Sequence, residues 1–109
     1  MALAKARVSM PAKAKQSDVI EIKTLIRHRM ETGYRVDTVG KSISRDIVTK
    51  LKVTYDGIEI FAMDFTQGVA ANPYIAFHTR ALDTGELVFV WQDAKGPLAT
   101  VRKTLTVST

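Results

Sequence analysis

Residues 47–65 of this 109-residue chain read IVTKLKVTYDGIEIFAMDF, and they decide the fold class. Polar and apolar side chains alternate through residues 47–55, as they do in a strand with one buried face. The Asp56-Gly57 pair that follows favours a tight hairpin, since such turns need positive φ. A return strand over residues 58–65 would turn three large apolar side chains to one face, namely Phe61, Met63 and Phe65. The stretch therefore predicts an antiparallel β-hairpin.

The same alternation, interrupted by turn residues, continues on both sides of this hairpin. We predict further strands over residues 6–10, 19–30, 74–81, 86–92 and 98–107. About seven strands around Leu87, Phe89 and Trp91 indicate an all-β fold, an immunoglobulin-like or fibronectin-like antiparallel β-sandwich. The length fits a single domain over residues 1–109, and we expect disorder only at residues 1–5 and 108–109.

The chain contains no cysteine, and its hydrophobic share of 46% is that of an ordinary globular protein. Disulfides, thiol catalysis, thiolate metal sites and a covalently held sulfur species are therefore excluded on this chain. No apolar run approaches the roughly 20 residues that a membrane-spanning helix needs. No signal-peptide stretch follows the basic start either, so we expect neither a membrane segment nor an export signal of its own.

The net charge of +5 suits an anionic partner, such as nucleic acid, a membrane surface or an acidic protein. Basic residues cluster only near the N-terminus, at Lys5, Arg7, Lys13 and Lys15. Elsewhere they are interspersed with Asp and Glu, which indicates a solvated, mildly basic surface rather than a nucleic-acid or membrane face. A free-standing β-sandwich module for an anionic ligand stays open as an alternative, and it would bind with steep salt dependence.

Neither a catalytic site nor a cofactor or metal site is predicted. His28 and His78 stand apart without a spaced third ligand, which argues against a metal centre. No serine lies in a glycine-flanked nucleophile motif, and the six glycines stand singly, so no phosphate-binding loop is expected. We therefore expect that the protein is not an enzyme; a small sandwich enzyme is a competing class for which no constellation of residues is found.

The segment His28-Arg29-Met30-Glu31-Thr32-Gly33 interrupts the strand pattern with a charged loop, and Arg35 and Asp37 follow it. Two interpretations fit this loop. In one, Met30 and Glu31 close the end of the sandwich while Arg35 and Asp37 form a local ion pair. In the other, the mixture of histidine, arginine, exposed methionine and glutamate provides an adaptable protein contact.

This loop, together with Gly40, Ile43 and Arg45 and with Ala71-Asn72-Pro73, resembles the SoxZ family. That family is the small non-catalytic subunit of the bacterial thiosulfate-oxidising Sox carrier complex. The resemblance covers about residues 19–93. It implies an immunoglobulin-like sandwich and a stable heterodimer with SoxY, whose glycine-flanked C-terminal cysteine carries the sulfur substrate. A chain without cysteine fits that division of labour.

The same resemblance implies transient docking to the enzymes SoxAX, SoxB and SoxCD, with no nucleic acid and no membrane among the partners. It also implies a periplasmic location, reached by export together with SoxY. We predict that apolar strand residues contact SoxY and that charged loops face the enzymes. The predicted partner-binding residues are His28, Met30, Glu31, Thr32, Arg35, Phe61, Met63, Phe65 and Asn72.

Overall fold

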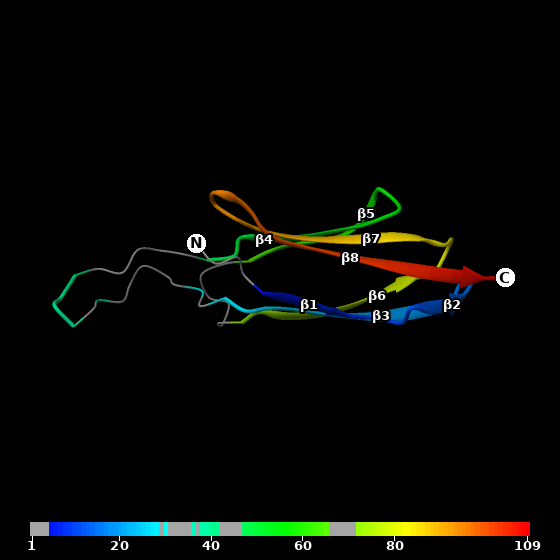
Figure 1. The fold of residues 1–109 in the computed structure, drawn as a ribbon, viewed down its shortest axis with the longest axis horizontal. Helices are drawn as coiled ribbons and strands as arrows, with labels where there is room; N and C mark the ends of the chain where they lie inside the picture. The colour runs from blue at the N-terminus through cyan, green and yellow to red at the C-terminus, as the bar shows by residue number, and fades with distance from the viewer. Residues whose placement is uncertain (1–4, 29, 31–35, 37, 42–46, 66–71) are drawn as a thin grey trace.

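The computed structural model describes residues 5–28, 30, 36, 38–41, 47–65 and 72–109, whose strands form two layers (Figure 1). The strands are β1 (Ala6–Ser9), β2 (Lys13–Lys15), β3 (Val19–Ile26), β4 (Lys50–Tyr55), β5 (Ile58–Asp64), β6 (Tyr74–Arg80), β7 (Gly85–Asp93) and β8 (Gly96–Ser108). One sheet has the order β2-β8-β7-β4-β5, and the other has the order β1-β3-β6. The predicted all-β sandwich is confirmed, with eight strands among the described residues instead of about seven.

The β4–β5 hairpin forms where the sequence predicts it. Asp56 and Gly57 both take positive φ, 52° and 82°, as the tight turn requires. β4 pairs with β5 on one side and with β7 on the other, and β8 continues the sheet beyond β7. A bulge shifts the register of β5, because Val53 lies opposite Phe61 whereas Thr54 lies opposite Glu59.

The smaller sheet is built around β3, which pairs antiparallel with β1 and β6 without a register shift. Every second residue of β3 is buried, as the alternation in this segment predicts. These residues are Ile20, Ile22, Thr24 and Ile26. The Thr24 hydroxyl donates a hydrogen bond to the Ile75 carbonyl at 2.9 Å, so this polar side chain is buried without an unsatisfied atom.

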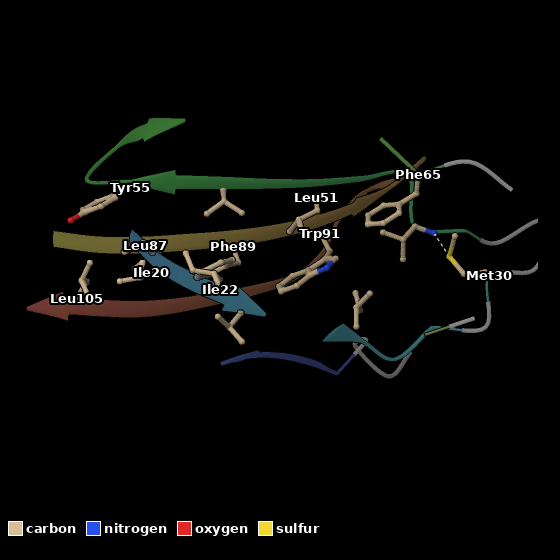
Figure 2. Packing of buried hydrophobic residues seen from close by; sticks show 14 of the residues in the cluster. Ile20, Ile22, Met30, Leu51, Tyr55, Phe65, Leu87, Phe89, Trp91 and Leu105 are labelled. Carbon is tan, nitrogen blue, oxygen red and sulfur yellow. Dashed lines mark hydrogen bonds between the residues drawn. The ribbon is translucent and has the colours of Figure 1, made fainter. Parts of the chain in front are cut away.

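The two sheets bury their inner faces against each other (Figure 2). Trp91 is 1% exposed and stacks on Phe89, with ring centroids 6.4 Å apart. Leu87 is fully buried beside them, so the predicted core of Leu87, Phe89 and Trp91 is confirmed. Since the chain has no cysteine, apolar packing rather than a disulfide joins the two sheets.

Several strand boundaries differ from those predicted. β2 was not predicted, because this three-residue strand forms only by pairing in parallel with the C-terminal end of β8, which is distant in sequence. β4 begins at Lys50 rather than at residue 47, and Ile47 and Val48, which precede it, are both buried. β3 ends at Ile26, short of the predicted residue 30.

Backbone hydrogen bonds join both ends of the described chain to the sandwich. The Arg27 N–H donates to the Lys5 carbonyl at 2.8 Å, and the Gln16 N–H donates to the Ser108 carbonyl at 2.7 Å. Disorder of residues 1–5 and 108–109 stays a prediction.

Tyr55 connects the end of β4 to the turn between β6 and β7. Its ring is buried, and its hydroxyl donates a hydrogen bond to the Asp83 carbonyl. The same hydroxyl accepts hydrogen bonds from the N–H groups of Leu82 and Asp83, both at 3.3 Å. The Tyr55 side chain thus provides hydrogen-bond partners for backbone groups of a turn that lies outside the strand pairing of both sheets.

We expect Tyr55→Phe to lower the free energy of unfolding by about 1–2 kcal/mol, because the turn loses its partner while the ring stays buried. Urea denaturation followed by the fluorescence of Trp91, the only tryptophan, would measure this. Tyr74→Phe is the matched control, since Tyr74 is 57% exposed and its substitution should cost less than about 0.5 kcal/mol. Equal losses in both variants would contradict the role of the Tyr55 hydroxyl.

Candidate functional site

Two segments that carry the family resemblance, one at His28 and one at Asn72, meet in the structure. The His28 N–H donates to Asn72 Oδ1 at 2.9 Å, and the Asn72 N–H donates to the His28 carbonyl at 2.7 Å. Asn72 takes a φ of 54°, in the left-handed region that asparagine tolerates better than most residues. The pair lies just beyond the β3–β6 ladder, where the Ile26 N–H donates to the Pro73 carbonyl.

Met30 extends this arrangement into the core. Its N–H donates to His28 Nδ1 at 2.9 Å, and its Sδ accepts a hydrogen bond from the Val48 N–H at 3.3 Å (Figure 2). The Met30 side chain is only 5% exposed. It therefore closes the end of the sandwich, as the first interpretation of this loop has it, and it is not an exposed methionine. We call His28, Met30 and Asn72 the end clamp.

The other predicted partner-binding residues lie elsewhere. Phe65 is buried near Met30 at the same end of the core (Figure 2), whereas Phe61 and Met63 are half-buried on β5. Outside the described residues lie Glu31, Thr32, Arg35 and Asp37. The described members of the predicted set thus lie in three places, which are the end clamp, the edge strand β5 and, for Phe65, the core. Partner contact stays a prediction at every position, and buried Met30 and Phe65 would offer a partner little of their side chains.

An aromatic stack joins the two sheets along one side of the sandwich. Phe61 on β5 and Phe77 on β6 have ring centroids 4.2 Å apart and planes inclined by 7°. Both rings are half-buried, because β5 ends the larger sheet and β6 ends the smaller one. We call this side, between β5 and β6, the open side. Phe77 was missed in the sequence, although the alternation in residues 74–81 could have assigned it to the inner face.

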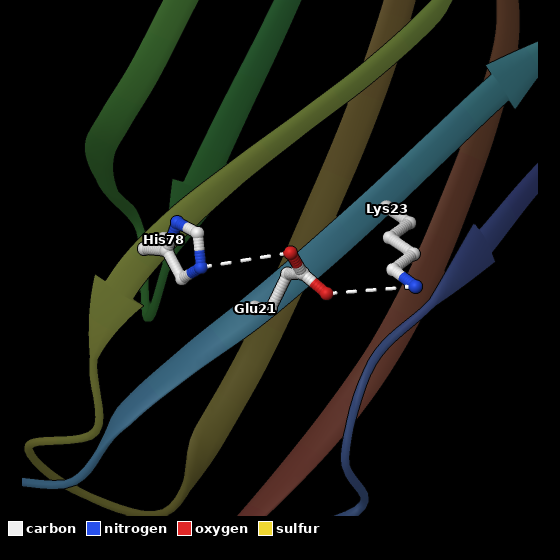
Figure 3. Close-up of polar contacts among 3 residues, drawn as sticks. All are labelled: Glu21, Lys23 and His78. Atoms are coloured by element: carbon white, nitrogen blue, oxygen red, sulfur yellow. Dashed lines mark ion pairs between the residues drawn. The ribbon is translucent and has the colours of Figure 1, made fainter.

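Polar side chains cross the outer face of the smaller sheet (Figure 3). Glu21 Oε2 lies 3.6 Å from His78 Nε2, and Glu21 Oε1 lies 3.5 Å from Lys23 Nζ. Each of these side chains is about half exposed, so water and salt screen the pairs, which contribute at most about 1 kcal/mol each. We interpret them as a solvated surface cluster.

Metal binding would need a cluster of ligand side chains, and a helical membrane segment would need a long apolar helix. Among the described residues, no group of three His, Asp or Glu side chains could hold a metal ion. In the same part of the chain, no helix is long and apolar enough to cross a membrane.

We expect Met30→Leu to lower the free energy of unfolding by about 1–3 kcal/mol, because the buried Val48 N–H loses its acceptor. Met63→Leu is the matched control, since Met63 is half-buried and its sulfur accepts no hydrogen bond from a described residue. That volume-conserving change should cost less than about 1.5 kcal/mol. Urea denaturation compares the two, and an equal cost would mean that the sulfur contact contributes nothing.

Solved structures with this fold belong to several kinds of protein. A variant superoxide reductase (neelaredoxin) from Ignicoccus hospitalis has a TM-score of 0.74 at 16% identity, over 98% of this chain and 83% of that chain. The sulfur carrier protein SoxY from Chlorobium limicola f thiosulfatophilum has a TM-score of 0.64 at 14% identity, over 95% and 79%. A CARDB domain from Pyrococcus furiosus has a TM-score of 0.60 at 11% identity, over 97% and 94%. At these identities the likeness shows the fold alone.

Sequence comparison identifies a family. No curated protein matches the chain. The model of the family described as "Sulphur oxidation protein SoxZ" matches residues 7–104, which is nearly the whole chain. This match includes the His28 and Asn72 segments that form the end clamp. The chain therefore belongs to the SoxZ family of sulphur oxidation proteins.

Proposed function

We propose that this protein is the non-catalytic subunit of a sulfur-carrier heterodimer and that its partner is a SoxY-type protein. Membership of the SoxZ family assigns the chain to sulfur oxidation by the Sox system. The observation that carries the proposal is that this chain has no cysteine. A sulfur intermediate held covalently on a protein needs a thiolate, so a second chain must supply it.

The two surfaces found above suit different kinds of contact. The open side exposes part of a stacked aromatic pair, and apolar surface of this kind suits a permanent subunit interface. The end clamp adjoins, in sequence, the charged segment that is predicted to be a loop, and charged loops suit encounters that must also release. In our proposal the partner occupies an apolar surface, while SoxAX, SoxB and SoxCD visit in turn and act on the cysteine of the partner.

The chain itself would perform no chemical step in this scheme. Its contribution is a rigid domain that holds the partner and presents it to the enzymes. The competing proposal, a free-standing module for an anionic ligand, relies on the net charge of +5. It requires binding that weakens steeply with salt.

Co-expression with the SoxY-type protein of the same organism should yield a one-to-one complex. Size-exclusion chromatography with mass determination of the eluted species would show it. If both chains fold but elute separately at micromolar concentration, the heterodimer proposal is wrong. Salt-dependent retention on heparin by the chain alone would then favour the anionic-ligand module.

Export together with the partner is the second testable part of the proposal, and it places the assembled pair in the periplasm. Deleting the signal peptide of the SoxY-type protein should leave this chain in the cytoplasm, because in our proposal the two chains are exported together. Cell fractionation and immunoblotting in the native host would measure the distribution. Finding the chain still in the periplasm would show that it is exported independently.

A further inference from the structure

We propose that the partner subunit adds a β-strand to the free edge of β6 and covers the Phe61–Phe77 stack with its own side chains. This inference rests on the proposed function, because the occupant is the SoxY-type subunit of the heterodimer. It specifies the surface that the partner occupies and the type of contact, which is main-chain pairing between edge strands.

The backbone of β6 has a row of groups that point away from its own sheet. Ile26 donates to the Pro73 carbonyl and the Ala81 N–H donates to the Asp18 carbonyl, so hydrogen bonds mark both ends of the β3–β6 ladder. In an antiparallel pair only every second residue bonds to the neighbour, and the register has no shift. The odd-numbered residues of β6 therefore bond to β3. The N–H and carbonyl groups that face away belong to Tyr74, Ala76, His78 and Arg80.

The other strand edges in the described part of the chain have features that hinder strand addition. β1 and β2 are only four and three residues long. β5 has the bulge opposite Val53 and Thr54. β8 is covered by β2 at its end, contacts β1, and has Lys103, which is itself exposed, on the inward face opposite the buried Leu87. Short strands, bulges and inward lysines are recognised protections of edge strands.

β6 has none of these protections. It has seven residues without glycine, proline or bulge, and it reads YIAFHTR. Its inner side chains include Phe77, whose ring is half-buried against Phe61. Figure 3 shows β3 between β6 and β1, so among the described residues no strand of the smaller sheet lies beyond β6. A long, regular edge beside a half-exposed aromatic pair is a template for a strand from another chain.

The charges around this edge indicate the chemistry of the added strand. Strand register places Arg7, Lys23 and Arg80 on the outer face of the smaller sheet, where Glu21 is the acidic residue among them. His78 lies on the same face opposite Glu21. A strand with acidic side chains on this face would complement the positive charge. The SoxY structure has the same sandwich fold, so a partner of that type also has edge strands to offer.

Hydrogen exchange tests the inference directly. In the chain alone, the N–H groups of Tyr74, Ala76, His78 and Arg80 should exchange fast, while those of Ile75, Phe77 and Thr79 should be protected. In the heterodimer the four even-numbered amides should slow by about 100-fold or more, because they gain partners. NMR of the labelled chain, alone and in the purified complex, resolves the two sets. Unchanged exchange at the even-numbered amides in an intact complex would overturn the inference and leave the heterodimer proposal standing.

Two matched alanine-to-proline variants provide a second test. Ala76→Pro removes an N–H that points away from β3, so the fold tolerates it while the added strand loses a donor. Ala6→Pro removes the equivalent outward N–H from β1, the other edge of the same sheet. We expect Ala76→Pro to raise the Kd for the partner by about tenfold or more, and Ala6→Pro to leave it within about twofold. Equal affinities would argue against pairing at β6.

Two further outcomes separate the alternatives. If the wild-type chain forms no complex, the proposed function fails, and the inference fails with it. If the even-numbered amides of β6 are already protected in the chain alone and sedimentation shows a dimer, the occupant is a second copy of this chain. That result would overturn the assignment to the partner subunit.

Discussion

The contact between the two inner sheet faces is the constraint on which this structure depends. Without a disulfide, the sandwich is held by side chains that alternate inward along each strand, with Trp91 and Phe89 on one sheet and Ile22 on the other. A one-residue slip in any of these strands would turn its apolar residues to water, so burial also sets the register. The end clamp and the open side both lie at the margins of this core, where the contact between the two inner faces ends.

The two long sides of the sandwich are closed in different ways. On one side the chain covers itself, since β1 contacts β8 and β2 extends the larger sheet. On the other side β5 and β6 end their sheets, and the Phe61–Phe77 stack bridges them. A half-exposed aromatic pair beside a regular edge strand is the kind of apolar surface at which proteins contact one another. It is the surface that we propose for the partner.

The fold and the family supply different parts of the functional argument. Superoxide reductase, SoxY and CARDB structures share this sandwich at identities of 11–16%, so the fold permits several functions and selects none. The family match assigns the chain to sulphur oxidation. That another protein supplies the thiolate, and that it binds at the edge of β6, are our proposals.

The sequence by itself determined the fold class, the β4–β5 hairpin and most of the core, because alternation with a period of two is set by residues close together in the chain. It also determined the family, through the His28 and Asn72 segments. Only the tertiary structure decided that these segments bond to each other, that Met30 is buried, and that β2 pairs with β8. It also decided that Phe61 meets Phe77 on the open side. Each of these contacts joins residues distant in sequence, and local periodicity has no information on which strands become neighbours or which edges stay free.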